Sequence, residues 1–236
     1  MRFVATRFAR GPALTDAFAA KSSRIRRLAT IFLALASQYV AAEAFEIQLL
    51  QKNGEPMAGA VVALEPVGSQ AAIDAPMPAQ PGTMDQINRQ FAPHILVVQR
   101  GAEVSFPNSD SIKHHVYSFS QAKTFEIKLY NDASPEALVF ERAGEVELGC
   151  NVHDWMLGYI YVVDTPFFTR SDETGRALLE APEGEYRLSW WHPRIRGSES
   201  ERSLQLASGQ YEVTVTLSRS LLRRYEQEEF TGGDYD

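Results

Sequence analysis

The segment CNVHDWM at 150–156 holds three side chains that bind soft metal ions. Cys150 offers a thiolate, His153 an imidazole and Met156 a thioether, and each donor stands three residues after the one before it. This set suits copper far better than magnesium or calcium, which prefer oxygen ligands. A structural zinc site normally takes four strong donors, often several cysteines, and this chain has one cysteine. The segment therefore predicts a copper site.

A blue copper site takes two histidines, one cysteine and a weakly bound methionine. The segment supplies only one histidine, so the second must come from elsewhere in the fold. His114 and His115 stand side by side in FPNSDSIKHHVYSF and lead into a predicted strand. The alternative for Cys150 is a buried thiol without a metal, because free cysteines are commonly buried and inert.

Strand periodicity indicates how these donors are positioned. In EVELGC at 145–150, Val146, Leu148 and Cys150 project to one face, so the thiol should point toward the core at the end of the strand. The same rule leaves the other ligand open. His114 alternates with Val116 and Ser118, whereas His115 alternates with Tyr117 and Phe119, and apolar content alone would turn His115 inward.

The chain as a whole reads as all-β. Clear alternation occurs in FEIKL at 125–129 and in YEVTVTL at 211–217, and the short strands are divided by Gly, Pro, Asn and Asp turns. This spacing favours β-sandwiches over a parallel α/β sheet. One short helix is predicted at 219–229, followed by an acidic tail that ends at residue 236.

The residues at 84–119 resemble the small blue copper proteins of the plastocyanin and amicyanin family. The loop Cys-x-x-His-x-x-Met follows at the expected distance and has the short amicyanin spacing. The resemblance covers about 84–164, and its shared features upstream of the loop are Met84, Phe91-x-Pro93, Gly101, Val104, Asn108, Asp110 and a histidine followed by x-Val.

This resemblance implies a cupredoxin Greek-key β-sandwich that binds one type 1 copper ion. The implied ligands are His114, Cys150, His153 and Met156, because the family places its first ligand directly before x-Val. His115 then stands where the family usually has Asn, so His115 and Asn108 are expected beside the ligands, with His115 as the alternative ligand. The resemblance also implies a partly apolar docking patch at Trp155, next to His153.

The flanking segments resemble a second family. NGEPMAGAVVALEP at 53–66 is similar to the opening of the carboxypeptidase regulatory-like, or transthyretin-like, β-sandwich, and its closing half appears at 171–193. We predict one discontinuous sandwich, 45–66 with 165–218, interrupted by the copper domain at 84–164. Residues 67–83, rich in Pro, Ala and Gly, are the predicted linker. Two unrelated hairpin groups are the alternative.

The N-terminus predicts export. An apolar run at 28–42 follows Arg24, Arg26 and Arg27, and a small-x-small cleavage site ends at Ala44, so residues 1–44 read as a cleaved signal peptide. The run is short for a bilayer span, so no stable membrane anchor is expected. We expect the mature protein in the periplasm.

Charge narrows the choice of partner. Residues 1–44 carry seven of the 23 basic and two of the 30 acidic side chains, so the remainder has 16 against 28 and a formal net charge of −12. This charge argues against nucleic acid and favours a basic partner. We expect a redox protein, such as a basic cytochrome c or a periplasmic dehydrogenase. The expected role is single-electron transport and not an enzymatic reaction, with a copper carrier or sensor as the alternative.

Overall fold

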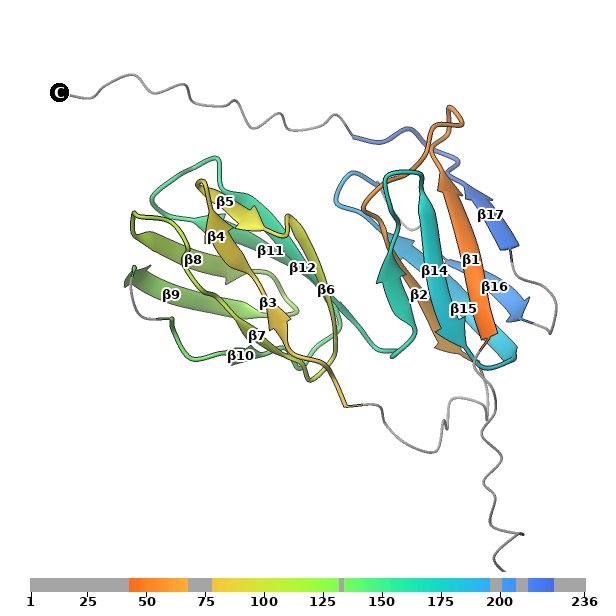
Figure 1. Ribbon diagram of the computed structural model, residues 1–236, viewed down its shortest axis with the longest axis horizontal. Coiled ribbons are helices and arrows are strands. Elements are labelled where there is room, and N and C mark those ends of the chain that lie inside the picture. The colour runs from red at the N-terminus through yellow and green to blue at the C-terminus, as the bar shows by residue number, and fades with distance from the viewer. Residues whose placement is uncertain (1–42, 68–77, 132–133, 196–200, 207–211, 223–236) are drawn as a thin grey trace, which may run out of the picture. The chain divides into compact units, whose positions relative to one another are not determined.

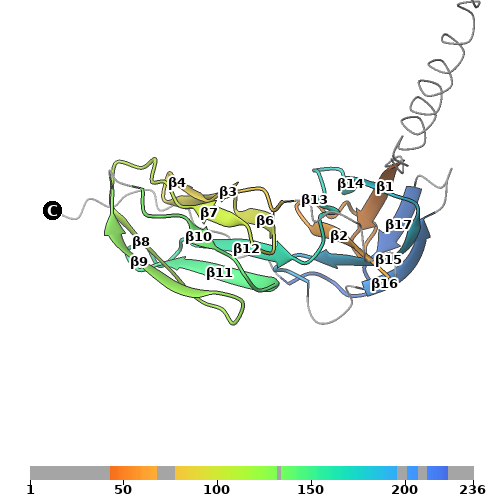
Figure 2. The same ribbon diagram turned by 90° about the horizontal axis from the view of Figure 1, so that it is seen from below.

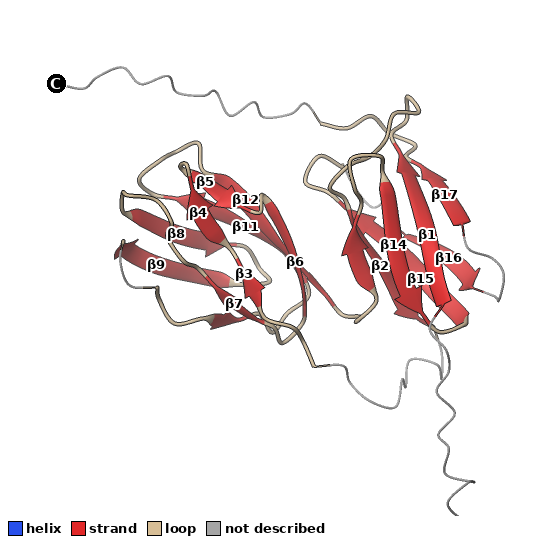
Figure 3. Ribbon diagram, viewed as in Figure 1, coloured by secondary structure: helices blue, strands red, loops and turns tan. Residues whose placement is uncertain are grey.

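The computed structural model describes residues 43–67, 78–131, 134–195, 201–206 and 212–222. Every regular element in these ranges is a β-strand (Figure 3), which confirms the all-β prediction. None of the described residues forms a helix long and apolar enough to cross a membrane. The predicted helix at 219–229 begins in residues that are not helical, 219–222, and the rest of it lies outside the described residues. The signal peptide also lies outside them, apart from Glu43 and Ala44, which begin the first strand.

The largest sheet presents two strands that carry candidate ligands. Its five strands follow the order β6, β12, β11, β8, β9; β6 and β12 are parallel and the other neighbours are antiparallel. Pairing of β11 with β8 sets Cys150 opposite Val116. The bounds are β6 (Ile95–Gln99), β8 (His114–Phe119), β9 (Thr124–Tyr130), β11 (Gly144–Cys150) and β12 (Leu157–Val163).

Smaller strands form the layer that faces this sheet (Figure 2). A three-stranded sheet has the order β10, β7, β3, and β4 pairs with β5. Apolar side chains from both layers fill one core, which includes Met84, Phe106, Val116, Phe140 and Leu148. The bounds are β3 (Gly82–Thr83), β4 (Asp85–Ile87), β5 (Gln90–Ala92), β7 (Glu103–Ser105) and β10 (Leu138–Val139).

The remaining strands form two further sheets. One has the order β14, β1, β17 and the other the order β13, β2, β15, β16 (Figure 1). Between them lies a second apolar core that includes Phe45, Ile47, Leu64, Tyr186 and Leu188. The bounds are β1 (Glu43–Leu50), β2 (Val61–Pro66), β13 (Phe168–Arg170), β14 (Arg176–Ala181), β15 (Gly184–Trp191), β16 (Glu201–Leu206) and β17 (Glu212–Thr216).

Strand pairing links segments on either side of residues 82–163. β1 pairs with β14 and β17, while β2 pairs with β13 and β15, so residues before 67 pair with residues after 167. Strands β3 to β12, between 82 and 163, pair only among themselves in the described part of the chain. This is the pairing that a nested arrangement requires. The domain boundaries themselves stay a prediction.

Candidate metal centre

The end of β11 and the loop after it position three candidate donors. Alternation along β11 buries Val146, Leu148 and Cys150, and Cys150 is 3% exposed. The chain then turns back on itself, because the Met156 N–H donates to the His153 carbonyl at 3.0 Å. His153 is half-buried and Met156 is buried. The short loop therefore holds its donors on one side of the strand end.

The fourth predicted ligand, His114, reaches the same place from β8. His114 is fully buried, and it alternates with the buried residues Val116 and Ser118. A register shift in the pairing of β8 with β9 falls between His114 and Val116. Such a bulge re-aims side chains at the end of a strand. The inward histidine of the pair is therefore His114.

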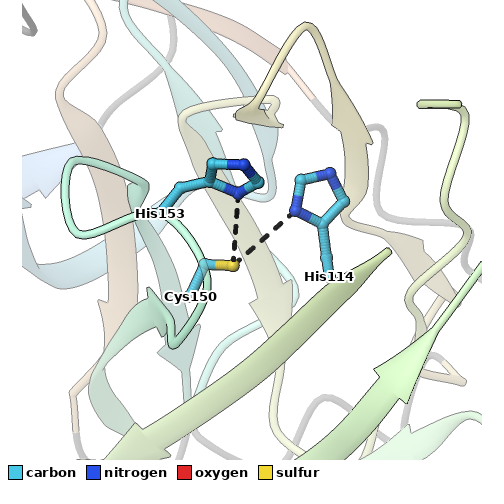
Figure 4. Close-up of side chains that lie close together, drawn as sticks. All are labelled: His114, Cys150 and His153. Carbon is cyan, nitrogen blue, oxygen red and sulfur yellow. Dashed lines mark hydrogen bonds between the residues drawn. The ribbon is translucent and has the colours of Figure 1, made fainter. Parts of the chain in front are cut away.

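Three donor atoms, from His114, Cys150 and His153, lie close together (Figure 4). The Cys150 Sγ lies 3.6 Å from His114 Nδ1 and 3.9 Å from His153 Nδ1. All three atoms lie within 4.8 Å of one another. Bond lengths typical of protein metal sites, about 2.0 Å to nitrogen and about 2.3 Å to sulfur, place such atoms about 3.7 Å apart when the metal lies in their plane. The donor spacing fits one metal ion.

Met156 belongs to the same apolar core as Cys150 and lines the same surface pocket. Met156 is 2% exposed. The structure thus brings together the donor atoms of three predicted ligands, His114, Cys150 and His153, whereas Met156 shares the core and the pocket lining with Cys150. Their binding of copper is a proposal, taken up below.

The other predicted site residues lie around the donors. His115 points to the opposite face of β8, where its Nε2 lies 2.9 Å from the Glu126 carboxylate, and it takes no part in the donor cluster. Asn108 donates to the Ile112 and Tyr130 carbonyls at 2.9 and 3.2 Å, which holds the turn before β8. The Trp155 ring lies 5.2 Å from the His153 ring, centroid to centroid.

The site contains a carboxylate to which the sequence analysis gave no role. His114 Nε2 lies 2.8 Å from the Asp110 carboxylate. Burial alone would raise the pKa of Asp110, but hydrogen bonds from the Arg89 N–H, the His114 ring and the Asn88 N–H outweigh burial and lower that pKa. The available signal was the position of Asp110, four residues before a predicted ligand.

The environment of His153 favours its neutral form. Partial burial lowers the pKa of His153, and interactions with His114 and Arg89 lower it further. A neutral imidazole keeps a lone pair for a metal, whereas an imidazolium has none. The loop histidine can therefore act as a ligand near pH 7.

A surface pocket of about 510 Å³ lies beside Cys150. Its walls combine three carboxylates with three aromatic rings, and no Lys or Arg lines it among the described residues. Phe119, one of the lining residues, is 81% exposed. The charged and aromatic lining residues are Glu145, Glu147, Asp154, Tyr117, Phe119 and Trp155.

No protein-family model matches the chain, and no curated protein matches it. Several solved structures are similar to part of the chain. A purple cupredoxin from Nitrosopumilus maritimus is 22% identical over 35% of this chain and 99% of its own, with a TM-score of 0.32. A reduced amicyanin variant is 21% identical over 34% of this chain and 80% of its own, with a TM-score of 0.31.

A copper-containing nitrite reductase from Thermus scotoductus is also similar. It is 20% identical over 50% of this chain and 28% of its own, with a TM-score of 0.34. A nitrite reductase is an enzyme, so the prediction that this chain is not an enzyme was wrong to exclude that class. The match assigns no particular activity to this chain.

Proposed function

We propose that the protein is a type 1 copper protein of the plastocyanin and amicyanin kind that carries single electrons between redox partners. His114, Cys150, His153 and Met156 would hold the ion, because two imidazoles, one thiolate and one thioether are the donor set of electron-transfer copper sites. The observation that carries this proposal is the convergence of one cysteine sulfur and two imidazole nitrogens where β11 ends and β8 begins. A bound copper ion would supply the Cu(I)/Cu(II) couple.

The donor set supports electron transport. Soft sulfur ligands stabilise Cu(I), imidazoles suit both oxidation states, and this mixture is typical of electron-transfer copper sites. Cys150 and Met156 are buried, and close packing around them would restrict their movement when a bound ion changes charge. The chain's residues would thus change little between the two oxidation states, and the half-buried His153 is the candidate ligand nearest the surface.

We further propose that the protein acts in the periplasm, after removal of residues 1–44, with a basic redox protein as partner. Support comes from the net charge of the remainder and from the acidic pocket beside Cys150. Carboxylates at Glu145, Glu147 and Asp154 would steer a basic protein, while Trp155 and Phe119 offer apolar contact at the same place. A basic cytochrome c meets this description.

We also propose that the flanking strands form a carboxypeptidase regulatory-like sandwich into which the copper domain is inserted. The pairing of β1 with β14 and of β2 with β15 supports this reading. The insertion would leave the ends of the copper domain close together, as domain insertion generally requires.

Addition of Cu(II) to the purified protein tests the proposed function. We expect one equivalent to produce an intense visible band from thiolate-to-copper charge transfer, with a matching electron-paramagnetic signal, and reversible bleaching by ascorbate. A colourless complex would contradict a type 1 site. A coloured complex that loses its copper on each reduction would instead identify a copper carrier or sensor.

A further inference from the structure

Both ring nitrogens of His114 have partners, although the side chain is completely buried. Nδ1 lies 3.6 Å from the Cys150 Sγ, and Nε2 lies 2.8 Å from the Asp110 Oδ2. A carboxylate can only accept a hydrogen bond, so Nε2 must carry the ring proton of a neutral imidazole. Nδ1 then presents its lone pair toward Cys150, which is the orientation that a metal ligand needs.

Asp110 is itself held in place. Its Oδ1 accepts the Asn88 N–H at 2.6 Å and its Oδ2 accepts the Arg89 N–H at 2.9 Å. Asn88 and Arg89 have φ angles of 54° and 57°, so two successive amides in the left-handed region point at one carboxylate. Such an arrangement binds an anion well. The Asp110 N–H donates to Asn108 Oδ1 at 3.0 Å, which fixes the carboxylate from its backbone side.

We propose that Asp110 is a positioning residue that selects the Nε2–H tautomer of His114 and lowers the reduction potential of the site. The first effect follows from the hydrogen bond alone. The second rests on the proposed function. A carboxylate partner raises the basicity of a ligating imidazole, and a nearby negative charge stabilises Cu(II) relative to Cu(I).

The chain contains a matched control for this pair. His115 Nε2 lies 2.9 Å from the Glu126 carboxylate, so two successive histidines each have a carboxylate partner at nearly the same distance. His115, however, lies on the other face of β8, outside the donor cluster. Glu126→Gln removes the same charge from the same kind of pair without touching His114.

The tautomer is tested on the metal-free protein. We would record long-range nitrogen-15 correlation spectra of the histidine rings in wild type, Asp110→Asn and Glu126→Gln. We expect His114 of the wild type as the Nε2–H tautomer. In Asp110→Asn, whose amide can donate to Nε2, we expect partial or complete conversion to the Nδ1–H tautomer, and no change in Glu126→Gln. An Nδ1–H tautomer in the wild type would overturn the proposal, even if Asp110→Asn failed to fold.

The potential is tested on the copper-loaded protein by spectroelectrochemical titration. We expect Asp110→Asn to favour Cu(I) by at least tenfold relative to the wild type, a rise of about 59 mV for a one-electron couple. Glu126→Gln should shift the potential much less. Equal shifts in the two variants would overturn a specific role for Asp110. If copper gives no type 1 spectrum at all, the proposed function fails, whereas the tautomer is still decided by the metal-free spectra.

Discussion

The Tyr117 ring lies directly on Gly149, the residue before Cys150. A Cβ added to Gly149 would lie 2.6 Å from Tyr117 Cζ and 2.7 Å from its hydroxyl oxygen. The two residues are register partners on β8 and β11. The strand that carries the thiol is thus packed against an aromatic ring on its outer face, and a larger residue at 149 must displace that ring.

Gly149→Ala should therefore destabilise the protein by about 1–3 kcal/mol, as overpacking commonly does. Denaturant unfolding measures this change. Tyr117→Leu removes the ring, so the double variant should be more stable than the sum of the two single effects implies. Strictly additive effects would show that the contact is not the cause.

Cys150→Ser should abolish the visible band of the copper-loaded protein, because the charge transfer needs the thiolate. The fold should persist, since serine is similar in shape and the change lies at a strand end. Visible absorption reports the site and far-ultraviolet circular dichroism reports the fold. An unchanged band in Cys150→Ser would remove Cys150 from the ligand set.

The two adjacent histidines should differ in their effect on copper. His114→Ala should abolish the blue spectrum and weaken copper binding by more than about tenfold. His115→Ala, which removes a ring on the opposite face, should change affinity by less than about threefold. Competition with a chelator measures both values. The reverse ranking would assign the ligand to His115.

The acidic pocket should govern association with a basic partner. In Glu145→Gln/Glu147→Gln, two carboxylates are lost beside Cys150, and we expect the second-order oxidation rate by a basic cytochrome c to fall roughly fivefold at low salt. Stopped-flow measurements across ionic strength check this. The difference should shrink as salt screens the charges.

Glu103→Gln/Glu141→Gln is the control for that experiment, since both residues are exposed and neither lines the pocket. Net charge changes equally in the two variants, so equal losses of rate would point to the overall field and not to the pocket.

Trp155→Lys should slow electron transfer within the complex and leave the copper spectrum largely intact. Unchanged transfer would place the docking patch elsewhere.

The flanking sandwich should be separable from the copper site. Phe45 is 1% exposed in the second core, so Phe45→Ala should cost about 3–5 kcal/mol there. If the copper domain folds as an inserted unit, the blue band should survive to a denaturant concentration at which that core has unfolded. Loss of the band together with the flanking core would contradict the nested arrangement.

The loop donors were predictable from sequence because their spacing is local. Cys150 and His153 need only a strand end and one turn to bring their donor atoms together, and Met156 follows in the same turn. The choice between His114 and His115 was not predictable from apolar content, which turned His115 inward. The structure instead exposes Phe119 and places Tyr117 on Gly149, so the aromatic residues of β8 cover its outer face.

The role of Asp110 depends on geometry that no spacing rule reveals. Its carboxylate accepts hydrogen bonds from the N–H groups of Asn88 and Arg89, which hold it beside His114. These two residues form the turn between β4 and β5 and precede Asp110 by 22 and 21 residues. Similarly, the parallel pairing of β1 with β17 joins residues at opposite ends of the described chain, and alternation within either strand says nothing of its neighbour.

The burial of Cys150 turns the chain's one cysteine into a natural reporter. A thiol-specific reagent can react at no other residue, and it can reach this one only when the end of β11 opens. Its reaction rate with the metal-free protein therefore gives the free energy of that local opening, in the manner of amide hydrogen exchange. A copper ion bound to the sulfur should block the reagent, so the labelled fraction also counts the molecules that lack metal.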